Sequence, residues 1–229
     1  MAETGLSLIV VTLNEADIID ETLGRLQGLR QAGSELIIVD GGSQDDTLTR
    51  ATPLASRVIQ SPPGRARQMN AGADAARGNH LVFLHADTQL PPHADWLVIN
   101  ALSRDHRWGR FDIRLQGRHP MLGVIAFAMN HRSRLTGIAS GDQTLFMTRE
   151  AFDTADGFPD QPLMEDIEMS RRLKRLSAPA CLREKVTSSG RRWDRDGAWT
   201  TIRLMWRLRF RYWRGESPET LAREYRHVR

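Results

Sequence analysis

The sequence is poor in cysteine and in long apolar runs, and each shortage excludes a class of protein. Cys181 is the only cysteine among 229 residues, so neither an internal disulfide nor a cysteine-based zinc site can form. The first apolar run breaks at Asn14 and Glu15 with no basic region before it, which is unlike a signal peptide. The apolar stretch 122–129 falls far short of the ~20 residues that a membrane-spanning helix needs. We therefore expect a cytoplasmic chain without a spanning helix.

Lysine is also scarce. Of the 32 basic residues, only Lys174 and Lys185 are lysines, and the formal net charge is +4. Arginine suits the bidentate binding of phosphate and carboxylate, so anionic ligands are expected, although a compositional bias toward solvated arginines explains any single one equally well. The length suits one α/β domain with, at most, a short appendage.

Apolar runs alternate with helical patterns along the first half of the chain. The runs predict strands at residues 6–11, 36–39, 57–60 and 79–84. Helices are expected between them, with Asn14 and Ser43 as N-caps of the first two and residues 65–77 and 91–103 as the next two. Such alternation predicts a parallel sheet.

Beyond residue 109 the alternation loosens. Strands are expected at 111–117 and 144–149, and helices at 120–135 and 164–176. The composition shifts near residues 190–197, after which tryptophan and arginine dominate. We therefore divide the chain into a main domain, 1–190, and a helical C-terminal tail, 191–229.

Acidic turns follow the predicted strands, and Asp87 is the pivotal one. In open α/β sheets ligands bind at the carboxyl ends of the strands, so an acid at such an end favours a ligand or metal site. Taken alone, Asp87 could equally cap the turn before Pro91. Three further polar turns, at residues 11–15, 39–47 and 164–168, strengthen the functional interpretation.

Two helix starts carry charged side chains. Arg65 and Arg67 lie in the first turn of the helix 65–77, where the helix dipole and two guanidinium groups could hold a phosphate or diphosphate. Solvated arginines are the alternative. Glu165 and Asp166 begin the helix 164–176, where acids complement the dipole without needing a functional reason.

The motifs, taken together, resemble a known family. VTLNE (11–15), VDGGSQDDT (39–47), HADT (85–88) and MEDIE (164–168) occur in this order. The ordered set resembles the inverting glycosyltransferases of family 2, especially a small bacterial subgroup with GRARQMNAG and FLHADT forms, over about residues 6–190. The resemblance implies the GT-A fold: a Rossmann-like, mostly parallel α/β sheet flanked by helices, here followed by an amphipathic helical tail.

The resemblance also implies roles for individual residues. It places Thr12, Asn14 and Glu15 along the nucleotide and Asp40 at its base or ribose. Asp87 is implied to be the surviving acid of a metal-binding D-x-D motif that uses Mg or Mn, with His85 in the position of the first acid.

For the later part of the chain, the resemblance makes Asp166 the catalytic base. Glu165 competes with it and ranks second. Arg191 or Arg192 stands where the family has a metal-binding histidine, and could hold the diphosphate directly.

The chemistry of sugar transfer fits these residue types independently of the family. A nucleoside-diphosphate sugar leaves a diphosphate behind, so the site must neutralise developing negative charge with a divalent cation or arginines. The acceptor hydroxyl must lose a proton, which a carboxylate can accept. The acceptor itself is not identified; a lipid-linked one is compatible with the tail described below.

Three other functions fit parts of the sequence less well. A sugar nucleotidyltransferase usually has a glycine-rich loop with a catalytic lysine, and this chain has no lysine before Lys174. A non-catalytic nucleotide-sugar-binding module is the second. The third, binding of single-stranded nucleic acid by the basic aromatic tail, is disfavoured because the acidic turns would repel phosphates.

The tail contains a strongly patterned helix at residues 199–214. An aromatic-rich face and a neighbouring arginine stripe are predicted, the first formed by Trp199, Ile202, Trp206, Phe210 and Trp213 and the second by Arg203, Arg207, Arg211 and Arg214. This composition is typical of a helix in a membrane interface, which predicts peripheral, reversible association with the anionic inner face of the cytoplasmic membrane. The alternative is that the aromatic face docks on the main domain.

Overall fold

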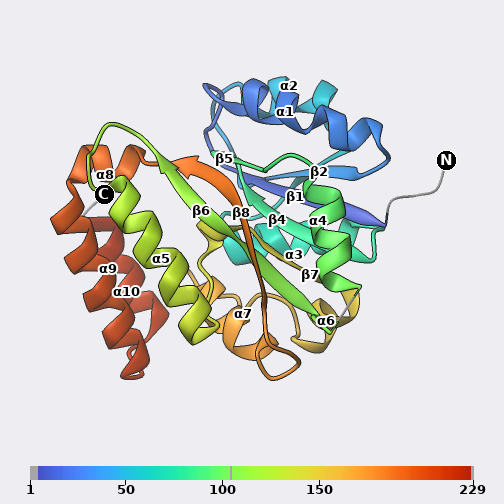
Figure 1. The fold of residues 1–229 in the computed structure, drawn as a ribbon. Helices are drawn as coiled ribbons and strands as arrows, with labels where there is room; N and C mark the ends of the chain where they lie inside the picture. The colour runs from blue at the N-terminus through green and yellow to red at the C-terminus, as the bar shows by residue number, and fades with distance from the viewer. Residues whose placement is uncertain (1–4, 104, 228–229) are drawn as a thin grey trace.

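The computed structural model describes residues 5–103 and 105–227 and contains an eight-stranded sheet with helices on both faces (Figure 1). The first four residues, on which the signal-peptide argument partly depends, lie outside the described part. The strands are β1 (Leu6–Thr12), β2 (Glu35–Asp40), β3 (Arg57–Gln60), β4 (His80–His85), β5 (Thr88–Gln89), β6 (Trp108–Gln116), β7 (Leu145–Thr148) and β8 (Ala180–Ser189).

The helices follow the predicted alternation. They are α1 (Ile19–Gln31), α2 (Thr47–Ala51), α3 (Arg65–Ala75), α4 (Ala94–Leu102), α5 (Leu122–Thr136), α6 (Arg149–Thr154), α7 (Glu165–Leu173), α8 (Arg191–Asp196), α9 (Ala198–Trp213) and α10 (Pro218–His227), with short 3-10 turns η1 (Thr52–Leu54) and η2 (Gly141–Gln143). The sequence did not predict β5, β8 or α6 as separate elements.

The strand order is β3-β2-β1-β4-β7-β6-β8-β5. The first four strands in this order are parallel, whereas β7 is antiparallel to both β4 and β6. In the parallel half, Thr12 pairs in register with Asp40, and Val11 pairs with His85. The polar residues that end β1, β2 and β4 therefore meet at one edge of the sheet.

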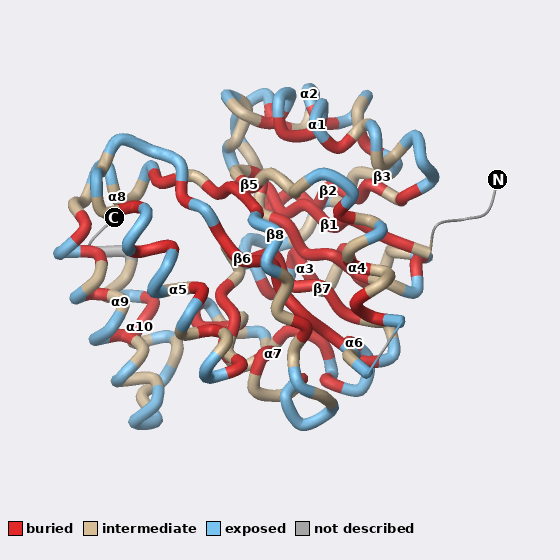
Figure 2. Tube along the Cα trace, viewed as in Figure 1, coloured by how far each residue is buried: buried red, intermediate tan, exposed pale blue. Residues whose placement is uncertain are grey.

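The core lies on both faces of the central strands, which are almost wholly buried (Figure 2). Alternate residues point to opposite faces: Leu8 and Val10 of β1 pack with α1, α4 and α5, while Ile9 and Val11 pack with α3, α6 and α7. Continuous apolar runs are expected for parallel strands covered on both sides. The predicted α/β class with a GT-A-like, helix-flanked sheet is confirmed.

The two predicted helix caps are wrong. Helix α1 begins at Ile19 and α2 at Thr47, well after Asn14 and Ser43. Asn14 instead has a left-handed backbone, with φ 55°, and its Oδ1 accepts the amide of Gln44 at 2.8 Å. The Ser43 hydroxyl accepts the amide of Asn14 at 2.8 Å. A side chain that can cap a helix can equally bind a neighbouring turn, and here the tertiary contact prevails.

The tail begins where β8 ends and forms a helical layer beside α5 (Figure 1). Leu204 and Leu208 of α9 pack with Leu221 of α10 and with Leu163 and Ile167 around the start of α7. The predicted tail helix is confirmed as α9. Among the described helices, none is both long and apolar enough to cross a membrane. The division at residue 190 stays a prediction.

The aromatic side chains of α9 do not dock on the main domain. Trp199, Trp206, Phe210 and Trp213 have exposed fractions of 63%, 73%, 58% and 69%. Only Ile202 of the predicted face is partly buried, against the cluster that contains Leu122 and Ile125 of α5. The docking alternative is therefore wrong, because the aliphatic side chains supply the packing face.

Candidate functional site

The turns after β1 and β2 form one side of the candidate site, which we call the donor side. The Thr12 hydroxyl lies 3.4 Å from Asp40 Oδ1. Asp40 is fully buried, and its Oδ2 accepts the amides of Gly42 and Ser43 at 2.9 Å each. Asp40 thus shapes the turn in this structure, and its contact with a base or ribose stays a prediction.

The GRARQMNAG segment holds the donor side in place. The Gln68 amide donates to the carbonyl oxygens of Thr12 at 2.8 Å and Val39 at 2.9 Å, which ties the ends of β1 and β2 together. A Cβ on Gly72 would lie 2.4 Å from Ile9, so only glycine allows α3 to approach β1 this closely. Asn70 exchanges hydrogen bonds of 2.8 and 2.9 Å with the backbone of Phe158.

The sequence did not identify Gln68, Asn70 and Gly72 as residues that position the site, because the functional interpretation of this motif rested on its arginines. Their signal was present: polar and glycine residues on the core-facing side of an alanine-rich helix need tertiary partners.

Arg191 joins two acidic turns of the donor side. Its Nη2 lies 3.3 Å from Glu15 Oε2 and 3.5 Å from Asp87 Oδ2. Burial raises the pKa of Glu15, although the charge of Arg191 opposes this shift. The structure therefore brings Arg191 together with Glu15, which was predicted to line the nucleotide, and with Asp87, which was predicted to bind the metal.

The predicted metal residues have only partly suitable surroundings. Among residues 5–103 and 105–227, no three His, Cys, Asp or Glu side chains gather as a ready-made metal site. Nucleotide-bound Mg²⁺ takes most of its ligands from phosphates and water, with one or two carboxylates, and Asp87 fits that demand. His85 is less suited because its Nδ1 faces Asp142 Oδ1 at 3.3 Å, so its role as a metal ligand stays a prediction.

Asp166 is the centre of the other side of the site, which we call the acceptor side. Its Oδ2 accepts the amide of Gly141 at 2.8 Å, and its Oδ1 accepts the amide of Ile167 at 2.7 Å. Burial raises the pKa of Asp166 in spite of these donors. A fixed carboxylate with a raised proton affinity is suited to act as a general base.

Glu165 has a different environment from Asp166. Glu165 is only 5% exposed, and its Oε1 lies 3.9 Å from Arg65 Nη1. Burial, and then the charge of Asp166, raise the pKa of Glu165. Glu165 is thus more buried than Asp166 and is paired with an arginine, and the ranking of Asp166 first stays a prediction.

Gly141 connects the two sides. Besides donating to Asp166, it packs on the ring of His85, where a Cβ would lie 2.9 Å from Cε1. His85 ends β4, two residues before Asp87. Burial opposes ionisation of Asp142, but the hydrogen bond and charge of His85 outweigh it and lower the pKa of Asp142. Asp142 was not predicted from the sequence.

The four arginines predicted to hold phosphate contact different partners. Arg65 faces Glu165, whereas Arg67 donates to Asp160 Oδ1 at 2.8 Å and is exposed. Residues two apart on a helix point about 200° apart, so Arg65 and Arg67 cannot share one ligand easily. Arg192 stacks over the Tyr225 ring, 4.2 Å from its centroid. Of the four, Arg191 alone lies against the strand-end acids Glu15 and Asp87.

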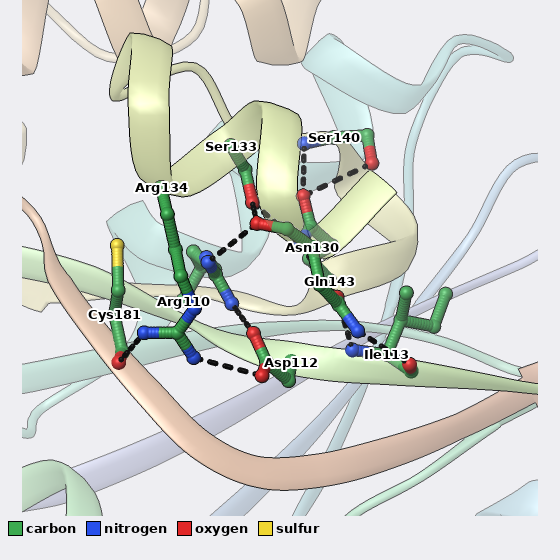
Figure 3. A network of polar contacts seen from close by, with 9 residues as sticks. All are labelled: Arg110, Asp112, Ile113, Asn130, Ser133, Arg134, Ser140, Gln143 and Cys181. Atoms are coloured by element: carbon green, nitrogen blue, oxygen red, sulfur yellow. Dashed lines mark hydrogen bonds and ion pairs between the residues drawn. The ribbon is translucent and has the colours of Figure 1, made fainter. Parts of the chain in front are cut away.

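A buried polar network supports η2 from behind (Figure 3). Asn130 of α5 exchanges hydrogen bonds of 2.8 and 3.0 Å with the backbone of Ile113. Gln143 donates to the Ser133 hydroxyl at 3.0 Å and forms a capping box with Ser140. The network therefore fixes η2, and with it the Gly141 amide that orients Asp166.

The site turns carry backbone strain. Asn14, Thr144 and Met164 have positive φ values of 55°, 52° and 67° without being glycine. These residues lie beside Glu15, η2 and Glu165 respectively. Strained conformations of this kind cluster at functional sites, where the surrounding structure enforces them.

Comparison with known proteins identifies the family. The family model for glycosyl transferase family 2 matches residues 7–152. A Staphylococcus aureus poly-beta-1,6-N-acetyl-D-glucosamine synthase is 26% identical over 129 residues, 53% of this chain and 31% of that protein. A Mycobacterium bovis PGL/p-HBAD biosynthesis glycosyltransferase is 37% identical over 97 residues, 39% of this chain and 38% of that protein. The chain thus matches only about a third of the length of these relatives.

Solved structures share the fold. Staphylococcus aureus TarS in complex with UDP aligns with a TM-score of 0.64 at 17% identity, covering 80% of this chain and 60% of that one. Glucosyl-3-phosphoglycerate synthase from Mycobacterium tuberculosis, with Mn²⁺ and UDP, aligns with a TM-score of 0.61 at 21% identity, covering 86% and 76%. With the family model covering most of the chain and the sheet edge built as predicted, the chain belongs to glycosyl transferase family 2.

Proposed function

We propose that this protein transfers a sugar from a nucleoside-diphosphate sugar to an acceptor hydroxyl with inversion, using Asp166 as the base. The observation that carries the proposal is the double contact of Gly141, which donates to Asp166 and packs on His85 at the end of β4. This contact joins the buried carboxylate of Asp166 to the end of β4, two residues before Asp87. An inverting transferase needs such an arrangement, because the base and the leaving diphosphate act on opposite faces of one sugar.

The donor diphosphate requires positive charge on its side of the site. Arg191 supplies a guanidinium next to Asp87 and Glu15. A divalent cation bound through Asp87 would add Lewis-acid stabilisation of the leaving diphosphate. The similar Mycobacterium tuberculosis synthase was solved with Mn²⁺ and UDP, which supports testing Mg²⁺ or Mn²⁺ with uridine nucleotides first.

A ligand screen with an activity arm tests this proposal. UDP- and GDP-sugars are mixed with the protein and Mn²⁺, and binding is read as a shift in melting temperature. A ligand at a hundred times its dissociation constant stabilises the folded state by about 2.7 kcal/mol. Absence of any shift would contradict the donor assignment.

The activity arm separates the alternatives. Release of nucleoside diphosphate with a panel of alcohol acceptors, lipid-linked ones included, supports transfer. Nucleotide-sugar binding without transfer to any acceptor would favour a binding module. Pyrophosphate release from a nucleoside triphosphate and a sugar phosphate would favour a nucleotidyltransferase.

We also propose that α9 holds the protein on the cytoplasmic face of a membrane. Its exposed aromatic side chains supply the apolar contact. The electrostatic contribution is smaller than the sequence predicted, because Arg207 and Arg211 both pair with Glu224 of α10. Arg203 and Arg214 have no acidic partner within the described part of the chain, and an anionic surface would attract them.

Vesicle co-sedimentation tests the tail. Changing Trp206 and Phe210 together to Ala should weaken binding by about a hundredfold or more, since burial of each side chain contributes roughly 1.5–3 kcal/mol. Trp96→Ala on α4 is the matched control, because Trp96 is also 62% exposed but lies outside the tail. Changing Arg203 and Arg214 to Gln should weaken binding to anionic vesicles by ~1 kcal/mol each. Equal sedimentation of wild type and the double aromatic variant would contradict the proposal.

A further inference from the structure

Helix α5 has an exposed apolar face. Val124, Phe127 and Leu135 are 63%, 63% and 82% exposed. At 100° per residue all three fall within about 80° of one another around the helix. The exposed ring of His131 lies on the same side and stacks on Phe127, with 4.7 Å between the ring centroids. Single apolar residues on a surface are ordinary, whereas a stripe along a whole helix indicates an interaction site.

The opposite side of α5 belongs to the enzyme body. Leu122 and Ile125 are part of the main apolar cluster. Asn130 and Ser133 bind the backbone of Ile113 and the side chain of Gln143, and so support η2. The exposed stripe therefore adds nothing to the packing of α5, and its apolar composition needs another explanation.

The exposed face of α5 continues the aromatic face of α9. The two helices run side by side in the same direction (Figure 1), and Ala198 and Ile202 of α9 pack in the apolar cluster that contains Ile125. Ile202 lies roughly 60° around α9 from Trp199, and Ile125 lies roughly 100° around α5 from Val124. Because the helices are parallel, both exposed faces lie on the same side of their contact. We call them together the α5–α9 surface.

The two helices of the α5–α9 surface have no acidic residues. Asp and Glu make up 28 of the 229 residues of the chain, but α5, with 15 residues, and α9, with 16, contain none. Arg203 is exposed beside the aromatic face. An apolar surface without negative charge is complementary to a bilayer with anionic headgroups. A second copy of the chain fits less well, because a twofold interface would set each basic face against itself.

We propose that Val124, Phe127 and Leu135 enter the bilayer, so that the whole α5–α9 surface, and not α9 alone, docks on an anionic membrane. The inference rests on the proposed function, in the part that places α9 on a membrane. A single amphipathic helix leaves the protein free to roll about the helix axis, whereas two neighbouring faces define a plane. The second face therefore fixes the orientation of the enzyme, with η2 on the side of α5 that faces away from the lipid.

Co-sedimentation with vesicles of phosphatidylcholine and phosphatidylserine tests the inference. Phe127→Ala combined with Leu135→Ala should weaken binding by about a hundredfold, since each of these side chains leaves water when it enters the bilayer. Trp96→Ala is the matched control and should sediment as wild type does, because Trp96 is similarly exposed but lies on α4. The melting temperature of the double variant should equal that of wild type. A lower one would mean that the stripe packs in the fold and would overturn the inference.

The results for two double variants separate the inference from the proposal for α9. Weaker binding of the Trp206 and Phe210 variant, with unchanged binding of the Phe127 and Leu135 variant, overturns the inference and leaves α9 as the contact. The reverse result supports α5 and contradicts the placement of α9. Wild type that sediments with no vesicle overturns both. A dimer in gel filtration that the Phe127 and Leu135 variant dissociates also overturns the inference, because the stripe is then an interface between two copies.

Discussion

The donor and acceptor sides of the site are built in different ways. The donor side consists of turns at the ends of β1, β2 and β4, which are neighbours in the parallel half of the sheet. The acceptor side is assembled from α5, η2 and the start of α7, which follow one another in the chain but are not neighbouring strands of the sheet. On the donor side strand register places the turns and Gln68 ties two of them together, whereas the acceptor side depends on packing and on a buried polar network.

The two sides also differ in the partners and the pKa values of their charged groups. On the donor side, Asp40 is satisfied by backbone amides and Asp87 lies against Arg191. On the acceptor side, the pKa values of Glu165 and Asp166 are raised. The difference is one of degree, because burial also raises the pKa of Glu15 on the donor side.

The largest expected effect comes from breaking the acceptor side. Asp166→Asn should lower turnover by about two to four orders of magnitude, the range for a lost general base, while UDP binding stays near wild type. Steady-state kinetics with a working acceptor and calorimetry with UDP measure the two quantities.

Glu165→Gln is the matched control for that experiment. It removes the neighbouring carboxylate, which is buried and paired with Arg65, so turnover should fall less than in Asp166→Asn. Turnover of Asp166→Asn within a few-fold of wild type would reduce Asp166 to a partner of the helix dipole.

Breaking the donor side should have a smaller effect on a different quantity. Asp87→Ala should weaken Mn²⁺-dependent binding of UDP by about tenfold, equal to about 1.4 kcal/mol, and leave metal-free binding nearly unchanged. Calorimetry with and without Mn²⁺ measures both. Asp153→Ala, which removes an exposed acid of α6, is a suitable control. Undiminished metal-dependent binding would remove Asp87 from the cation site.

The smallest expected effect concerns the pH dependence of the free energy of unfolding, which depends on the acceptor-side carboxylate Asp166. The raised pKa of Asp166 means that the folded state holds its proton more tightly than the unfolded state does. The stability that this group contributes is present at low pH and is lost as pH rises through the raised pKa. Asp166→Asn should therefore be more stable relative to wild type at pH 7 than at pH 4.

Urea unfolding of both proteins at the two pH values measures that difference. Asp160→Asn is the control, because Asp160 is exposed in its ion pair with Arg67. A stability difference that does not change with pH, or that changes in the opposite sense, would contradict a desolvated carboxylate at Asp166.

The sequence by itself determined the central strands, the order of the acidic turns and the family. Apolar runs identify parallel strands because both faces of such strands are buried, and polar residues just after them must lie at the sheet edge. The amphipathic period of α9 likewise needed no tertiary information. The ordered motifs then identified a family that the comparison confirmed.

Only the tertiary structure decided which charged groups meet. The assignments of Asn14 and Ser43 as caps failed because a side-chain oxygen can bind its own helix or a turn some 30 residues away with similar energy. Arg65 and Arg67 looked equivalent in the motif, but the helix turns them toward different acids. Gly141 and Asp142 had no sequence signal at all, since their positions beside Asp166 and His85 arise from the packing of η2, and such tertiary contacts leave no periodicity in the chain.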